Sequence, residues 1–90
     1  MDEEFKEFIK KNLNSNKIIL GSNKVLKLIR AGKIKKVYIA SNCREDIKRE
    51  LEQLSKVGNF ELIELKKLSN KDVGILCRRQ HNVSVVGIQE

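Results

Sequence analysis

One stretch of the chain combines residue types and spacing that suit contact with an anionic partner. In "LGSNKVLKLIR" four polar residues lie three or four positions apart, so they share one side of a predicted helix: Asn23, Lys24, Lys27 and Arg30. Gly21 precedes this helix and would let another backbone approach without a Cβ in the way. The helix N-terminus adds unpaired N–H groups and a partial positive charge that favour phosphate. An asparagine can pair with a base edge while lysine meets phosphate or guanine, so the pattern is compatible with nucleic-acid binding.

The same residues also fit a purely structural interpretation. Ser22 or Asn23 could cap the helix, and the lysines could form a solvated face. Spacing alone leaves both interpretations open.

Motifs for catalysis or metal binding are absent from the sequence. There is no GxxxxGK[ST] and no GxGxxG after a strand, and His81 lies in the loop "RRQHN" without a nucleophile or carboxylate partner. Cys43 and Cys77 are too far apart for a CxxC metal site, and we expect two free thiols in a reducing compartment. We therefore predict a protein that is not an enzyme and that uses no cofactor and no metal.

The basic residues are concentrated in the first half of the chain. The net charge is +7, and ten basic residues but no acidic ones lie between Phe8 and Arg44. This asymmetry predicts one basic face. No apolar run reaches the roughly 20 residues of a membrane span, and the N-terminus lacks the features of a secretory signal, so we expect a cytoplasmic protein.

The hydrophobic pattern predicts alternating helices and strands. We expect helices over about 2–13, 23–31, 43–57 and 69–77, and strands over 18–20, 37–40, 60–65 and 83–88. Capping boxes are predicted from Asn42 with Glu45 and from Ser69 with Asp72, and helix ends from Gly32 and Gly58. The order predicts a single α/β domain over residues 1–90, a three-layer α/β/α sandwich around a small mixed sheet of about four strands.

Two separated segments together resemble one known family. "LGSNKVLKLIRAGKIKKVYIASNC" and "DVGILC" resemble the two signatures of the kink-turn-binding ribosomal protein superfamily, which includes the L-seven-Ae and L-thirty-e proteins. The similarity runs from Lys17 to Ile88, and "IASNC" with the small size favours the L-thirty-e branch.

The resemblance implies a structural ribosomal protein that binds a kink-turn in large-subunit rRNA beside neighbouring ribosomal proteins, with no small-molecule substrate. By position, Asn23 and Lys27 would contact the guanine edges of tandem sheared G·A pairs. Lys24 stands where relatives often carry an acceptor and is expected at phosphate. The complete predicted RNA-binding set is Gly21, Ser22, Asn23, Lys24, Lys27, Arg30, Arg78, Arg79, His81, Asn82 and Val83.

One loop departs from the family pattern. Arg78 replaces the usual glycine after the cysteine, and "RRQHN" is more polar than the usual apolar loop, so an arginine or His81 would stack on the flipped-out base. Two alternatives use the same fold: a subunit of a guide or ribonuclease-P-type ribonucleoprotein, and a non-catalytic protein adaptor.

Overall fold

The computed structural model describes residues 2–13 and 15–89, which alternate between helices and strands. The elements in chain order are α1 (Asp2–Asn12), β1 (Ile18–Leu20), α2 (Ser22–Arg30), β2 (Ile34–Ile39), α3 (Glu45–Val57), β3 (Glu61–Glu64), α4 (Asn70–Leu76) and β4 (Val85–Gln89).

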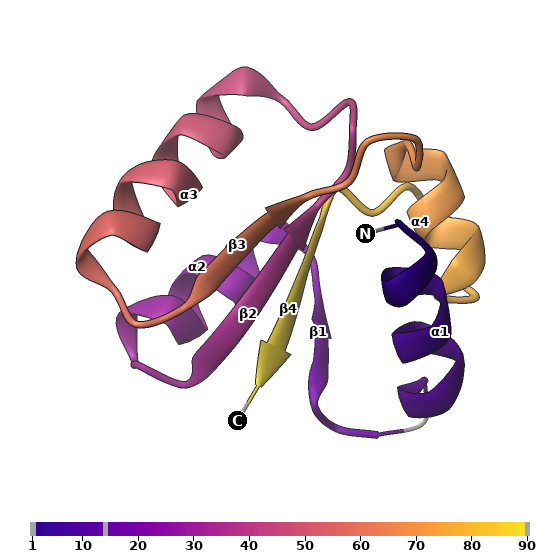
Figure 1. Cartoon of the computed structure of the whole chain (residues 1–90), viewed down its shortest axis with the longest axis horizontal. Coiled ribbons are helices and arrows are strands. Elements are labelled where there is room, and N and C mark those ends of the chain that lie inside the picture. The colour runs from indigo at the N-terminus through magenta and orange to yellow at the C-terminus, as the bar shows by residue number, and fades with distance from the viewer. Residues whose placement is uncertain (1, 14, 90) are drawn as a thin grey trace.

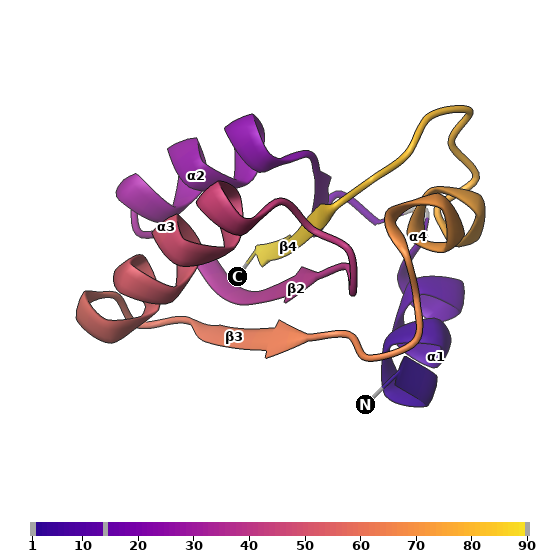
Figure 2. The same cartoon turned by 90° about the horizontal axis from the view of Figure 1, so that it is seen from above.

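The four strands form one mixed sheet in the order β1-β4-β2-β3. β4 runs antiparallel to both β1 and β2, whereas β2 and β3 are parallel. Figures 1 and 2 show α2 and α3 together on one side of the molecule and α1 and α4 on the other. The predicted three-layer sandwich with a mixed sheet is confirmed.

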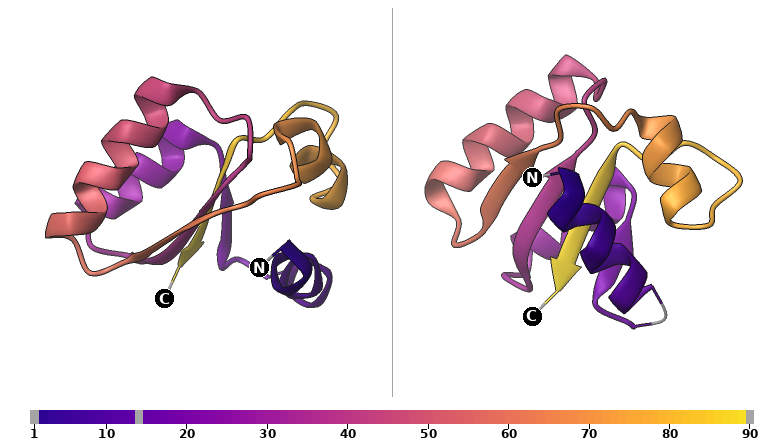
Figure 3. Two further views of the ribbon diagram at one scale, coloured as in Figure 1. Left: turned by 45° about the horizontal axis from the view of Figure 1, so that its top comes forward. Right: turned by 45° about the vertical axis from the view of Figure 1, so that its right-hand side comes forward.

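Each face of the sheet has its own apolar core. Phe5 and Ile9 of α1 pack with Tyr38 of β2 on one face, and the right-hand view in Figure 3 shows α1 lying over the strands. Val25 of α2 and Leu51 of α3 pack on the other face. β2 supplies alternate residues to both cores, as expected for a strand covered on both sides.

Several predicted boundaries are corrected. β2 begins at Ile34, three residues earlier than expected, and β4 begins at Val85. The capping box at Asn42 is wrong, because Arg44 occupies the N-cap position of α3 without a side-chain cap hydrogen bond. Gly58 does end α3 but is extended, whereas Gly32 has the left-handed φ of 72° that follows a helix. The capping box of Ser69 with Asp72 is confirmed.

Both cysteines are free thiols, as predicted. Cys77 is buried, and Cys43 is half-buried. Among the described helices, none is long and apolar enough to cross a membrane. Residues 2–13 and 15–89 hold no group of three His, Cys, Asp or Glu side chains that could bind a metal ion.

Candidate nucleic-acid interface

The junction of β1 and α2 is built around the backbone of Gly21. Its N–H donates to the Val85 carbonyl at 3.0 Å, and its carbonyl accepts from the Val25 N–H at 3.1 Å. Gly21 has φ 102°, which other residues rarely adopt, and no heavy atom lies within 4 Å of the Cβ position. Glycine is therefore required here by the backbone conformation, and the space beside it stays open.

The N-terminus of α2 has no side-chain cap. Gly21 is the N-cap residue, Ser22 and Asn23 already belong to the helix, and its first turn contains no acid. The capping interpretation of Ser22 and Asn23 is therefore wrong. The first N–H groups of the helix and its positive dipole end are available to an anionic partner.

The two faces of α2 are confirmed. Val25 is fully buried, and Leu26, Leu28 and Ile29 pack beside it in the core. The opposite side is exposed and carries Asn23, Lys24, Lys27 and Arg30. Arg30 differs from the other three because it lies about 12 Å along the helix from the N-terminus and its guanidinium is 3.5 Å from the Glu50 carboxylate.

The second predicted RNA-binding segment, the loop from Arg78 to Val83, begins where α4 ends. The Arg79 N–H donates to the Gly74 carbonyl at 2.8 Å and the Arg78 N–H donates to the Ile75 carbonyl at 3.0 Å. This pair of bonds is a Schellman motif, whose next-to-last residue adopts the left-handed conformation and is usually glycine. Arg78 has that conformation, with φ 57°. The departure from glycine noted in the sequence therefore places a side chain in a backbone conformation that disfavours it.

Gly74 allows the loop after α4 to lie directly against the helix. A Cβ at this position would lie 2.4 Å from the His81 carbonyl oxygen, much closer than atoms tolerate. The glycine within "DVGILC" thus has a steric role that the sequence pattern did not show. Figure 2 shows the segment from α4 to β4 folding back beside the helix.

A polar network that sequence reasoning missed fixes the other end of this loop. The Asn42 side chain accepts from the Asn70 backbone N–H at 2.7 Å and donates to the Asn70 side chain at 3.2 Å. The Asn70 carbonyl accepts from the Val83 N–H at 3.0 Å. Asn42 therefore joins the end of β2 to the start of α4 instead of capping α3. Its spacing to Glu45 had suggested a local partner, whereas the actual partner is 28 residues away.

These supports bring the two predicted segments together around open recesses. One, of about 220 Å³, is lined by Gly21 and Ser22 from the first segment and by His81, Asn82 and Val83 from the second, with Ile47 of α3 among its apolar walls. A second, of about 230 Å³, shares Leu20 and His81 with it and adds Lys24 and Arg79. None of the described residues that line the two recesses is acidic.

The remaining predicted residues lie elsewhere. Asn23 and Lys27 lie on the exposed face of α2 and line neither recess. Arg78 lines a larger hollow along β1, which adjoins the second recess and shares Ile18, Ile19, Leu20 and Arg79 with it. Val83 is only 3% exposed and packs in the core under α1 and α4, although it also lines the first recess, so its contact with RNA stays a prediction.

Comparisons with known proteins identify the family of this chain. The model of the "Ribosomal protein L7Ae/L30e/S12e/Gadd45 family" matches residues 3–90, and the chain belongs to this family. The "Large ribosomal subunit protein eL30" of Sulfolobus acidocaldarius is 40% identical over 88 residues, covering 98% of this chain and 84% of that protein. The Archaeoglobus fulgidus protein of the same name is 32% identical, covering 97% and 95%. The resemblance to the L-thirty-e branch is confirmed.

A solved structure supports the fold. The "Giardia lamblia 15.5kD RNA binding protein" superposes with a TM-score of 0.83 over 99% of this chain and 73% of that chain, at 21% identity. At this level of identity the likeness concerns the fold alone.

Proposed function

We propose that this chain is a structural, non-catalytic RNA-binding protein of the large ribosomal subunit that holds a kink-turn in rRNA. The observation that carries the proposal is the pair of recesses in which the β1–α2 junction meets the α4–β4 loop, lined by basic and neutral residues only. The extensive similarity to archaeal eL30 proteins supports the ribosomal assignment. Its location would be the cytoplasmic ribosome, beside other ribosomal proteins.

The uncapped end of α2 would bind the RNA backbone, and its exposed face would read the bases. Asn23 has both an amide donor and a carbonyl acceptor for a base edge, and Lys27 follows one helical turn later on the same face. We assign these two side chains to the guanine edges of the tandem sheared G·A pairs. Lys24 faces the recess with Arg79, and we assign this cationic pair to phosphate.

The recess between Gly21 and Asn82 would receive the flipped-out base. Bases extruded from RNA are recognised by stacking and by hydrogen bonds to their edges. His81 supplies a flat ring and Asn82 an amide at this recess, while Leu20 and Ile47 supply apolar walls. His81 thus takes the stacking role that an apolar loop plays in the relatives that the sequence resembles.

A gel-shift assay with two matched RNAs tests this proposal. One RNA carries a kink-turn, and the other has its tandem G·A pairs replaced by G·C pairs. Asn23→Ala and Lys27→Ala should each weaken binding to the kink-turn by about 5- to 150-fold, since a good base contact is worth about 1–3 kcal/mol. Lys27→Ala should also make the dependence of log affinity on log salt shallower by about one if the lysine also contacts a phosphate.

Matched controls separate the site from general charge. Asn59→Ala and Lys56→Ala remove the same side chains from exposed positions at the far end of α3 and should leave affinity within about twofold. Equal binding of the two RNAs by the wild-type protein would refute kink-turn recognition. Crosslinking and sequencing of bound RNA would then separate large-subunit rRNA from the small RNAs of guide or ribonuclease-P-type particles.

A further inference from the structure

β1 lies at the edge of the sheet and leaves the backbone polar groups of two of its three residues unpaired. Ile19 lies opposite Gly87 of β4, and the flanking bonds run from the Gly21 N–H to Val85 and from the Gln89 N–H to Lys17. In an antiparallel pair, residues that exchange hydrogen bonds with the partner strand alternate with residues whose N–H and C=O groups point away from it. Lys17, Ile19 and Gly21 belong to the first kind, and the residues between them belong to the second. Ile18 and Leu20 therefore present two donors and two acceptors along the open edge.

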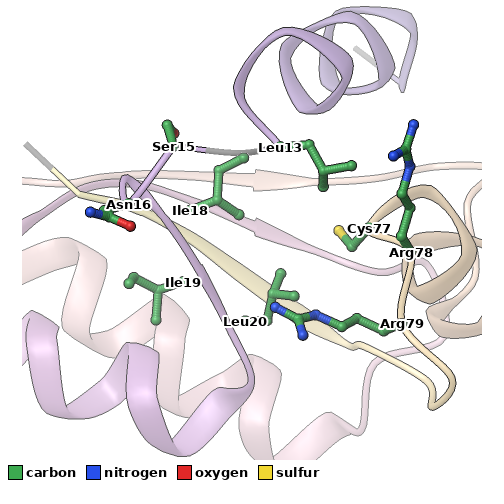
Figure 4. Close-up of a pocket in the computed structure, with 9 residues that line it drawn as sticks. All are labelled: Leu13, Ser15, Asn16, Ile18, Ile19, Leu20, Cys77, Arg78 and Arg79. Atoms are coloured by element: carbon green, nitrogen blue, oxygen red, sulfur yellow. The ribbon is translucent and has the colours of Figure 1, made fainter.

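A hollow of about 520 Å³ lies along the same edge, and Figure 4 shows its lining. Its apolar lining includes Leu13 from the end of α1, Ile18 and Leu20 from β1, and Cys77 from the end of α4. The Arg79 side chain extends towards Leu20 in this view, and Arg78 rises from the same turn. The hollow therefore combines a strand edge, an apolar floor and two guanidinium groups.

Both arginines at this hollow are unpaired within the described part of the chain. The ion pairs among residues 2–13 and 15–89 do not include Arg78 or Arg79, both of which are exposed, and no acidic residue lines the hollow. Arg78 also retains a left-handed backbone that glycine would occupy without strain. An arginine in that conformation is explained if its charge is needed at this place.

The geometry points to an extended acidic segment of a partner protein that adds to β1 as a fifth strand of the sheet. Alternating free N–H and C=O groups match an extended peptide, whose apolar side chains would enter the hollow. Its carboxylates would pair with Arg78, as arginine forks bind carboxylates in two-bond geometry, while Arg79 is assigned to phosphate in the adjoining recess.

Other occupants fit this hollow less well. Single-stranded nucleic acid is held by stacking on aromatic rings, and no aromatic residue lines this hollow. A second copy that paired β1 with β1 would bring four arginines together. This site goes beyond the proposed RNA-binding function and would serve contact with a protein neighbour.

Amide hydrogen exchange followed by NMR tests this proposal with a defined probe. The probe is a nine-residue peptide of alternating glutamate and valine, and its control replaces glutamate by lysine. In the free protein the amides of Ile18 and Leu20 should exchange much faster than that of Ile19. The glutamate peptide should slow both by at least tenfold, and the lysine peptide should not.

Variants separate strand addition from general attraction. Ile18→Pro removes one outward N–H at the first residue of the strand and should weaken peptide binding at least tenfold, whereas Ile18→Val should not. Arg78→Gly should also weaken peptide binding at least tenfold, and glycine preserves the left-handed backbone of the turn. Asn23→Ala, which lies outside the hollow and should weaken RNA binding, should leave binding of the glutamate peptide unchanged, so that failure of this site and of the RNA site are distinguishable.

Several results would overturn the proposal. Slow exchange of Ile18 and Leu20 in the free protein would show that the edge is not open. Protection by the lysine peptide, or by kink-turn RNA in place of the glutamate peptide, would assign the edge to another type of ligand. Concentration-dependent protection accompanied by dimer-sized particles in size-exclusion chromatography would assign it to a second copy of the chain.

Discussion

Replacing Gly74 by alanine should separate helix stability from the placement of the α4–β4 loop, which we propose binds RNA. The new Cβ would lie 2.4 Å from the His81 carbonyl oxygen, so the loop must retreat by more than half an ångström to reach a contact of 3.0 Å. Overpacking of this kind costs about 1–3 kcal/mol. Alanine in a helix regains about 1 kcal/mol relative to glycine. The net expectation is a free energy of unfolding lower by about 1 kcal/mol.

The same displacement should weaken RNA binding. His81 lines both recesses, so its retreat opens the space in which the base is expected to stack. We expect at least a tenfold loss of kink-turn affinity, or about 1.4 kcal/mol, and a melting temperature lower by about 4–8 °C for each kcal/mol of lost stability.

The neighbouring Ile75→Ala provides a matched control, because Ile75 is 63% exposed and its side chain faces solvent. That variant should bind RNA normally and melt within a few degrees of the wild type. An alanine at position 74 that raised the melting temperature and left RNA affinity within twofold would refute the steric role of Gly74. Unchanged affinity with reduced stability would show that the position of His81 does not govern binding.

Three further substitutions address the supports of the fold. Arg78→Gly should raise the free energy of unfolding by about 0.5–1 kcal/mol in urea titrations by relieving the left-handed backbone, whereas Arg78→Ala should not. Burial raises the pKa of Asp2, but hydrogen bonds from the backbone N–H groups of residues 66–68 outweigh it and hold this pKa below 3.8. A lowered pKa stabilises the fold above pH 3.8, so Asp2→Asn should be less stable at pH 7, and urea titrations should show the difference shrinking as the pH falls towards 2. Asn42→Ala should lower the free energy of unfolding by about 1 kcal/mol and speed amide exchange at Asn70, with no change of exchange in the first turn of α3. Faster exchange in that turn would show that Asn42 caps α3.

The layered fold was predictable because local periodicity and tertiary packing agree. Val25 and its apolar neighbours recur at helical spacing, and all of them pack on one face of the sheet. "VYIA" is apolar at successive positions, and its residues are shared between the two cores. The errors fall where a local pattern competed with a distant partner. Asn42 fits a cap by spacing, yet its hydrogen bonds join β2 to α4 across 28 residues.

The candidate site was predictable in one segment more than in the other. The face of α2 follows from helical geometry, so the exposure of Asn23, Lys24 and Lys27 needed no knowledge of the fold. The loop from Arg78 to Val83 has no period, and only the structure shows that Val83 is buried while His81 borders the recesses. Sequence pattern could not reveal Gly74 as a steric partner of His81, because the contact depends on how the loop folds back.

The separation between the two segments proposed to bind RNA depends on a single strand pairing. The Gly21 N–H bonds to the carbonyl of Val85, and Val85 begins the strand that leaves the α4–β4 loop. The spacing between the α2 N-terminus and His81 is therefore governed by the register of β1 on β4. A shift of one residue would turn Ile19 towards the other core and carry Gly21 away from Val85. The three residues of β1 thus position the proposed RNA site with one edge, while the opposite edge carries the free backbone groups at which we propose a further strand.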